Sequence, residues 1–483
     1  MKQIINIIFV FWVTHTVAQS NLVDYTIIGN ENNEYSTDVD TLDGFIYVTG
    51  NTNECQLNDG FVFKYKNNNV FARKIIGTES IDILETIKTF STDSIMVAGY
   101  NNINGDYDIY VAKLDTQLNT IQQRTIAINN WNFCHDITNN GNGYFIGVGE
   151  THNNNDYDAL IFKLSTNLDT LWTLAPNIAN DQKLTKVIPY NDSIFIACGY
   201  SVVDGAEKDI LLISINANTG DTLWTNTYGG INNDFCNSII KTLDGGIAGF
   251  GTTSSYNSTS EDTYLFKTDS AGMFLWSNLH QVQTANNLYS DRGIDLVELS
   301  NGDFLVTNMT KSFGSVNVKS LMIMQTNSLG NWVNGLTYDG GEDDYPTSMV
   351  KINDTNIVII GNNNSQSSGY QDIFLLNFKS FNNANFNVTN LVLPPTCFTK
   401  INDKENIKIS LYPNPIKDLF CIKSHKKELL EIEILNAEGK KCLKKKIYTN
   451  TNIIFPKELD YGFYMIRILN SDLPQTFKVI YVK

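Results

Sequence analysis

The chain has 483 residues, of which 42% are hydrophobic and 18% charged, so it is long enough for one large globular domain and a smaller one. Its formal net charge is −16; residues 401–483 hold 15 Lys+Arg and 10 Asp+Glu, which leaves −21 on the rest. So acidic a body argues against nucleic acid and anionic membrane surfaces as partners. It is compatible with a cation or a neutral glycan as ligand, although acidity alone mainly favours solubility.

Residues 1–18 have the pattern of a secretory signal peptide. Lys2 supplies a basic start, Ile4–Val13 is a short apolar run, and Thr16-Val17-Ala18 forms a cleavage site before Gln19. The run is too short to span a bilayer comfortably, and no other segment is apolar enough for a transmembrane span. No cysteine follows the cleavage site, so no lipid anchor is expected. We predict that the mature chain leaves the cytoplasm as a soluble monomer.

A pattern of about fifty residues then repeats seven times. Each copy has an apolar run, a loop and a second apolar run, and the first runs end at Gly50, Gly99, Gly149, Gly199, Gly251, Asn308 and Gly361. The steps between these ends are 49, 50, 50, 52, 57 and 53 residues. A period of this length without helical spacing is typical of radially repeated sheets. We therefore predict an all-β fold, with a seven-bladed β-propeller over residues 19–390.

An aspartate begins the second apolar run in six of the seven copies: Asp59, Asp108, Asp158, Asp209, Asp262 and Asp372, with Lys319 in that place in the sixth copy. These runs are apolar at nearly every position, which indicates strands covered on both faces. Six equivalent aspartates are too many for one catalytic site. We interpret them as hydrogen-bond acceptors that stabilise the blades.

Tryptophans mark the strand that follows the second run. Trp172, Trp224, Trp276 and Trp332 come after a polar turn in four consecutive copies, and we take them to hold the same place. They could form an aromatic binding stripe. A repeated position favours repeated packing instead, so we interpret them as packing residues.

The segment Val23–Gly29 resembles the outer-strand segments of the repeats, such as Thr225–Gly229 and Gly335–Asp339. We predict that it completes the last blade, which would remove an open sheet edge. A competing closure uses Phe381–Val388.

The composition changes near residue 395. Six of the nine prolines lie after residue 390, and the charge changes sign there. We assign residues 391–406 to a linker and residues 407–483 to a small β-sandwich with strands over 407–412, 420–423, 430–435, 446–448, 464–469 and 476–482.

Four motifs stand in order in this last module: Leu411-Tyr412-Pro413-Asn414-Pro415, Ile434–Lys440, Leu459–Ile466 and Phe477–Ile480. Together they resemble the type A C-terminal sorting domain of the type IX secretion system, whose members come from Bacteroidetes-type bacteria. The resemblance implies recognition by the translocon and sorting machinery, followed by surface attachment or release. In that family the domain is commonly cut off. The residues that match the family pattern are Pro413, Asn414, Pro415, Gly439, Gly462, Tyr464 and Lys478.

The seven cysteines are Cys55, Cys134, Cys198, Cys236, Cys397, Cys421 and Cys442. Cys421 and Cys442 in the small module are the one pair to test for a disulfide. The propeller cysteines are interpreted as buried free thiols.

Catalytic motifs are absent from the sequence, which has no HExxH, GxSxG or P-loop. Cys134-His135-Asp136 is a local triple, but strand neighbours point to opposite faces, so we do not expect convergence. His152 lacks a second histidine at ligand spacing, and we predict no metal or cofactor site. Weak Ca²⁺ binding is conceivable at the oxygen-rich loops Asn104–Asp106, Asn153–Asp156 and Ser258–Asp262, which turn formation also explains.

Two hypotheses remain for the propeller. One is a secreted or surface-displayed binding or scaffold protein whose ligand is a glycan or a protein, and the alternative is a propeller-fold polysaccharide hydrolase or lyase. A propeller enzyme needs repeat-breaking acid or base groups near the channel. The repeat breaks at Asn308, at Lys319 and in the loop Gln281–Asp291, which hold few such groups, so we favour binding. Paired carboxylates or a His–Asp couple at the channel mouth would reverse that preference.

Overall fold

A computed structural model of the chain divides into two compact units, Met1–Cys397 and Phe398–Lys483. The structure describes residues 22–392 and 410–481, apart from gaps at 55–57, 78–79, 104, 129–130, 154–155, 177–179, 203–206, 257–259, 281–288, 314, 316–317, 366–370, 382–384, 413–415, 418, 424–428, 437–439, 455, 457–458, 461 and 470–475. The described residues form strands and turns with no helix. The predicted signal peptide and residues 393–406 of the predicted linker lie outside them.

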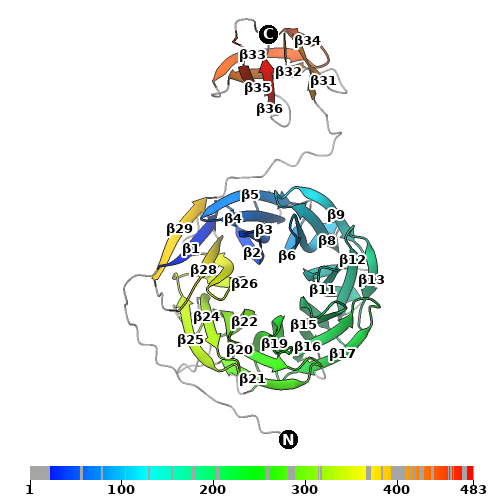
Figure 1. Cartoon of the computed structure of the whole chain (residues 1–483), viewed down its shortest axis with the longest axis vertical. Coiled ribbons are helices and arrows are strands. Elements are labelled where there is room, and N and C mark those ends of the chain that lie inside the picture. The colour runs from blue at the N-terminus through cyan, green and yellow to red at the C-terminus, as the bar shows by residue number, and fades with distance from the viewer. Residues whose placement is uncertain are drawn as a thin grey trace. The chain divides into compact units, whose positions relative to one another are not determined.

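The first unit is a seven-bladed β-propeller, as predicted (Figure 1). Its sheets surround a central channel, and blades 1 to 6 each hold four antiparallel strands in chain order. Blade 1 is β2 (Glu34–Leu42), β3 (Phe45–Thr52), β4 (Asp59–Lys66) and β5 (Asn69–Ile76); blade 2 is β6 (Asp82–Ser91), β7 (Ser94–Ile103), β8 (Asp106–Asp115) and β9 (Thr120–Ile126); blade 3 is β10 (Asn132–Thr138), β11 (Tyr144–Asn153), β12 (Asp156–Ser165) and β13 (Thr170–Leu174).

Blade 4 is β14 (Gln182–Pro189), β15 (Ile194–Val202), β16 (Lys208–Asn216) and β17 (Thr222–Tyr228); blade 5 is β18 (Asp234–Lys241), β19 (Ile247–Thr253), β20 (Asp262–Thr268) and β21 (Phe274–His280); blade 6 is β22 (Asp291–Glu298), β23 (Phe304–Thr310), β24 (Ser320–Thr326) and β25 (Trp332–Tyr338). Blade 7 has five strands: β26 (Asp344–Asn353), β27 (Asn356–Asn363), β28 (Asp372–Phe378), β1 (Leu22–Gly29) and β29 (Asn385–Val392).

The N-terminal strand closes the ring, which confirms the prediction for Val23–Gly29. β1 runs antiparallel to β28, with Ile27 opposite Phe374. The competing segment also joins the sheet, since β29 lies parallel to β1 on its outer side. Tyr25 is fully buried, with ring centroids 4.5 Å from Tyr338 and 5.2 Å from Phe374. Blade 7 is therefore built from both ends of the propeller sequence.

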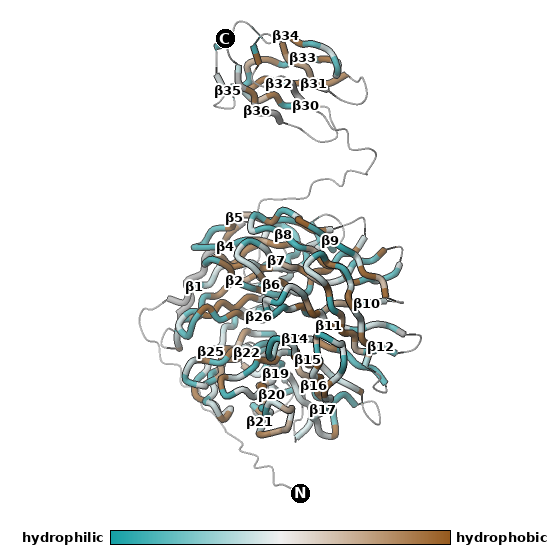
Figure 2. Tube along the Cα trace, turned by 45° about the vertical axis from the view of Figure 1, so that its right-hand side comes forward, coloured by the Kyte–Doolittle hydropathy of each residue, from teal (hydrophilic) through white to brown (hydrophobic). Residues whose placement is uncertain are grey.

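The cores lie between neighbouring blades, where one sheet packs on the next. In β19 and β20 every residue is buried, as the unbroken apolar pattern predicted. One cluster joins Val148 and Ile161 of blade 3 to Val187 and Leu211 of blade 4. Hydrophobic segments recur within the strands in Figure 2.

The first strand of every blade contains a β-bulge, and in six blades the repeated glycine of the second strand lies opposite it. The bulges fall between Ser36 and Asp38, Leu84 and Thr86, Cys134 and Asp136, Leu184 and Lys186, Cys236 and Ser238, Gly293 and Asp295, and Pro346 and Ser348. At the six repeated glycines an added Cβ would lie 1.8–2.2 Å from a carbonyl oxygen of the first strand. The repeated glycine therefore makes room for the bulged backbone.

In blade 6 the glycine beside the bulge lies on the first strand instead of the second. Asn308 takes the glycine position on β23, and its cross-strand partner is Gly293. The glycine has moved to the other strand, so this break in the repeat is a packing feature rather than a sign of chemistry.

Lys319 does not occupy the aspartate position, which corrects the sequence alignment. Asp59 lies opposite Thr52, and the matching pair in blade 6 is Ser320 opposite Thr310. Ser320 is fully buried, like Asp59 in blade 1. Lys319 lies one residue earlier and forms an ion pair of 3.4 Å with Asp343.

Replacement of Gly293 by alanine is expected to lower the free energy of unfolding by about 2 kcal/mol. The new Cβ would lie 2.4 Å from the carbonyl oxygen of Gly251 and 2.8 Å from the Phe250 ring in blade 5. Urea unfolding of Gly293→Ala beside wild type measures the difference. Equal midpoints would show that blades 5 and 6 do not pack this closely.

Three of the four tryptophans are packing residues as predicted, but they pack against the next blade, whereas the sequence led us to expect packing on their own blade. Trp172, Trp224 and Trp276 lie over the turn glycines Gly220, Gly272 and Gly330 of the following blades, where a Cβ would come within 2.5–3.3 Å of the indole. Trp332 is not equivalent to them, because it pairs with Thr326 at the place that Phe274 holds in blade 5. In blade 6 Asn334 holds the position that the tryptophan holds in the other three blades, so Trp332 was wrongly matched with them from the sequence.

The second unit consists of two small sheets with a shared core. One sheet has β30 (Ser410–Tyr412), β31 (Leu419–Lys423) and β34 (Asn452–Ile454); the other has β33 (Lys441–Tyr448), β32 (Leu429–Asn436), β35 (Gly462–Ile468) and β36 (Thr476–Tyr481). Phe420 and Ile422 of the first sheet pack with Ile432 and Ile466 of the second. The sequence missed β34, which is only 3 residues long.

No cysteine in the described part of the chain is bonded to another. Cys421 is buried and Cys442 is exposed, and both are free thiols, so the pair chosen for testing forms no disulfide in this structure. Cys134, Cys198 and Cys236 are buried free thiols, which confirms their interpretation.

Candidate functional site

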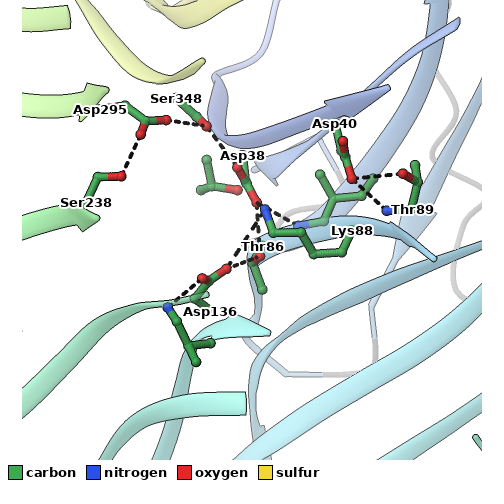
Figure 3. Close-up of polar contacts among 12 residues, drawn as sticks. Asp38, Asp40, Thr86, Lys88, Thr89, Asp136, Ser238, Asp295 and Ser348 are labelled. Atoms are coloured by element: carbon green, nitrogen blue, oxygen red, sulfur yellow. Dashed lines mark hydrogen bonds and ion pairs between the residues drawn. The ribbon is translucent and has the colours of Figure 1, made fainter. Parts of the chain in front are cut away.

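One polar residue from each blade faces the central channel, immediately after the bulge. Together they form a ring that we call the channel ring: Asp38, Thr86, Asp136, Lys186, Ser238, Asp295 and Ser348 (Figure 3 labels all but Lys186). The bulge adds one residue to the first strand and so shifts the alternation of its side chains by one position. The residue after the bulge therefore points into the channel, where regular alternation would have turned it to the other face of the strand.

The three aspartates of the channel ring join neighbouring blades through backbone amides. The backbone N–H of Ile87 in blade 2 donates to Asp38 Oδ2 at 3.1 Å, that of Val187 in blade 4 to Asp136 Oδ2 at 2.9 Å, and that of Met349 in blade 7 to Asp295 Oδ2 at 2.9 Å. Each carboxylate therefore fastens its own blade to the next one along the chain.

Hydroxyl groups bridge further pairs of blades. Thr86 Oγ1 lies 2.9 Å from both Asp38 Oδ2 and Asp136 Oδ1, between the two carboxylates (Figure 3). Ser348 Oγ lies 2.8 Å from Asp38 Oδ1, and Ser238 Oγ donates to Asp295 Oδ1 at 2.6 Å. These bonds connect blades 2 and 3, 7 and 1, and 5 and 6.

Two lysines balance the negative charge of the channel ring. Lys88 Nζ contacts Asp38 Oδ2 at 2.8 Å and lies 3.9 Å from Asp136 Oδ1. Burial alone would raise the pKa of Asp38, but Lys88 and Lys186 hold it well below its ordinary value. Burial alone would lower the pKa of Lys186, and the facing Asp136, Asp38 and Asp295 raise it instead. The charged groups of the ring, together with Lys88, thus offset one another.

A second layer of side chains lies above the channel ring and lines a cavity of about 260 Å³. It is made by the bulged residues themselves: Thr37, Glu85, His135, Thr185, Asn237, Ile294 and Thr347. Thr185 Oγ1 donates to Cys236 O at 2.8 Å, and Asn237 Nδ2 donates to Gly293 O at 2.6 Å. Several residues of this layer are therefore also tied to the next blade.

Cys134, His135 and Asp136 do not converge on one site, as predicted, although the cause includes a bulge that the sequence did not reveal. Cys134 is buried, and burial raises the pKa of its thiol well above the ordinary value. Asp136 faces the channel, and His135 Nε2 lies 3.2 Å from Glu150 Oε1. The three residues are therefore not a nucleophilic triple.

Glu150 is shared between His135 and a lysine of the next blade. Lys183 Nζ lies 3.4 Å from the same Oε1 atom. Burial would raise the pKa of Glu150, but the hydrogen bond from His135 and the charge of Lys183 lower it. A histidine–carboxylate couple at the channel mouth is the kind of group expected of a propeller enzyme, although the carboxylate is a glutamate and not the aspartate considered from the sequence.

The remaining candidate residues lie apart from the channel. His152 contacts the rings of Trp131 and Tyr157 and does not line the channel cavity. Within the described residues, no three His, Cys, Asp or Glu side chains gather as metal ligands. The loops considered for Ca²⁺ include residues outside the described ranges, so weak binding there stays a prediction.

The sorting-signal residues fall partly outside the described ranges. Pro413, Asn414, Pro415 and Gly439 are not described; Gly462 begins β35, and Lys478 lies in β36 opposite Met465. Tyr464 is buried, and its hydroxyl donates to Asp460 O at 2.8 Å. Their role in sorting stays a prediction.

Comparison with known families identifies the second unit. Residues 410–483 match the family of secretion system C-terminal sorting domains. This sorting domain indicates export to the cell surface or secretion and interaction with the type IX machinery, as the sequence motifs predicted. No helix among the described residues is long and apolar enough to cross a membrane. A search of curated proteins finds no match.

Among solved structures, the chain is similar to PorZ, an essential bacterial surface component of the type-IX secretion system of Porphyromonas gingivalis, with 12% identity and a TM-score of 0.43 over 92% of this chain and 59% of PorZ. It is also similar to the β-propeller domain of the Trilobed protease from Pyrococcus furiosus (11% identity, TM-score 0.42, 71% of this chain and 93% of that one). A protein of unknown function from Dyadobacter fermentans has 10% identity and a TM-score of 0.46, over 74% of this chain and 98% of that one.

Proposed function

We propose that the protein is a type IX secretion cargo whose propeller acts outside the cell as a binding or scaffold module, with a glycan or a protein as ligand. The match of residues 410–483 to the sorting-domain family carries this proposal. The signal pattern of residues 1–18 adds an export route through the periplasm.

The hydrogen bonding of the channel favours binding over catalysis. The aspartates of the channel ring accept backbone amides of neighbouring blades, and the lysines beside them are neutralised. Groups held in this way maintain the ring, whereas catalysis needs a group free to gain or lose a proton at the substrate. The cavity above the ring then serves as a small polar recess in a rigid frame.

Truncation after residue 406 is expected to stop export, because the translocon recognises the folded sorting domain. The measurement is the location of the chain, by protease treatment of intact cells and by fractionation of periplasm and medium. We expect full-length protein at the surface or in the medium and the truncated chain in the periplasm. Surface delivery of the truncated chain would contradict the proposal.

A polysaccharide hydrolase or lyase is the second candidate function, and the His135–Glu150 couple favours it. A carboxylate can orient an imidazole as a general base, and the couple stands beside the cavity. Shortened or unsaturated products from a polysaccharide, lost in His135→Ala, would establish this function.

A further inference from the structure

Six aromatic side chains of blades 2 and 3 form a continuous surface that we call the aromatic patch: Tyr100, Tyr107, Trp131, Phe133, His152 and Tyr157. Ring centroids lie 4.8 Å apart for Tyr100 and Phe133, 5.5 Å for Tyr107 and Trp131, and 4.9 Å for His152 and Tyr157. The contacts cross from β7 and β8 to β10, β11 and β12, so both blades contribute.

The aromatic patch is open to solvent, unlike the aromatic residues of the blade cores. Trp131 is 37% exposed, and the other five rings are half-buried. By contrast, Phe145 and Phe162 of blade 3 are almost completely buried. Rings that stay accessible while they brace one another present flat faces of fixed orientation at little entropic cost on binding.

The patch leads into the channel-mouth cavity. Phe133 stacks on His135, with ring planes 7° apart and centroids at 6.5 Å, and His135 lines the cavity together with Glu85 and Lys183. Within the described part of the chain, Glu85 makes no hydrogen bond or ion pair, so its carboxylate is available as an acceptor. One surface therefore offers aromatic faces at one end and hydrogen-bonding groups at the other.

We infer that the aromatic patch and the adjoining cavity bind a neutral saccharide chain, an inference that rests on the proposed binding function and names its ligand class. Sugar rings have an apolar C–H face that stacks on aromatic rings and an equatorial edge of hydroxyl groups. The rings of Trp131 and Tyr107 can stack on the apolar face of a sugar. Glu85, His135 and the hydroxyl groups of the cavity can form hydrogen bonds with its hydroxyl groups. The net charge of −21 on the chain before residue 401 disfavours uronic-acid chains and acidic peptides.

The test uses the mature chain, residues 19–483, in calorimetric titrations. The probes are hexasaccharides of β-1,4-glucose, β-1,3-glucose, α-1,4-glucose, β-1,4-mannose and β-1,4-xylose, with hexagalacturonate and hexalysine as comparisons. We expect at least one neutral hexasaccharide to bind and Trp131→Ala to weaken it about tenfold or more. The matched control is Leu171→Ala, an exposed apolar residue on the outer strand of the same blade, which should leave the affinity unchanged.

Thermal melting checks that Trp131→Ala is folded. If Trp131→Ala does not fold, the affinity of Tyr107→Ala for the hexasaccharide tests the patch instead. The inference would be overturned if no neutral hexasaccharide binds, or if Trp131→Ala and Tyr107→Ala bind it as tightly as wild type does. It would also be overturned if hexagalacturonate or hexalysine binds more tightly than every neutral hexasaccharide. Any of these results would leave the export experiment untouched, because that experiment measures only where the chain is found.

Discussion

Deletion of residues 22–29 from the mature chain is expected to abolish cooperative unfolding. The deleted strand β1 lies between β28 and β29, and Tyr25, Ile27 and Ile28 are buried. Each of these side chains contributes about 2 kcal/mol by burial, and the deletion also removes two ladders of backbone hydrogen bonds. An open blade 7 would then expose the edge of β28 and the apolar faces beside it.

Thermal unfolding followed by circular dichroism measures this effect, with deletion of residues 385–392 as the matched control. That control removes β29, an outer strand with one neighbour, and should unfold cooperatively at a lower temperature. If both deletions unfold like wild type, β1 does not close the ring.

Replacement of Asp38 by asparagine is expected to cost about 3 kcal/mol of unfolding free energy near neutral pH. The carboxylate meets Lys88 Nζ at 2.8 Å, the Ile87 amide at 3.1 Å and Ser348 Oγ at 2.8 Å, so it joins blade 1 to blades 2 and 7. Asparagine keeps the shape, but it leaves the partly buried Lys88 without its nearest counter-charge and removes one of the three carboxylates that stabilise the charge of Lys186. Asp93→Asn, at an exposed turn, is the control and should change stability by less than about 0.5 kcal/mol.

The pH dependence separates the charge of Asp38 from its shape. The pKa of Asp38 in the folded chain is below its unfolded value near 3.8, so its stabilisation is complete above about pH 4 and is lost as the pH falls further. Burial raises the pKa of Glu34 to about 7, so that residue instead adds stability as the pH falls from 7 towards 4.5. Chemical unfolding should therefore show a difference between wild type and Asp38→Asn that is constant from pH 7 to 5 and shrinks below about pH 4. A constant difference down to pH 3 would mean that the charge is not what stabilises the ring.

The blades were predictable because their signal is local. Apolar runs of strand length, a period near fifty and glycines at fixed places report burial on both faces without knowledge of which strands pair. The closing strand was found in the same way, since Val23–Gly29 resembles the outer strands elsewhere in the chain. The register of the strands was harder to predict. The sequence alignment placed Lys319 at the start of the second apolar run in blade 6, where the structure has Ser320.

The site was not predictable from the same pattern. Strict alternation cannot say which residue after a bulge turns into the channel, so the sequence did not mark Asp38 and Asp295, and it marked Asp136 only as part of a local triple. The aromatic patch escaped notice because Tyr100 and Phe133 lie in different blades and meet only when the sheets pack. The bulges left one signal in the sequence, the glycine opposite six of the seven, and a polar residue at the matching place in every first strand could have been identified from it.

Fusion of a monomeric fluorescent protein between residues 1–21 and residues 393–483 shows whether the two ends of the chain are enough to export a foreign cargo. The fusion is followed in a type IX-competent host by protease treatment of intact cells and by fractionation. We expect fluorescent protein on the cell surface or in the medium, as for the full-length chain. Retention in the periplasm, while the full-length chain is exported from the same cells, would contradict it.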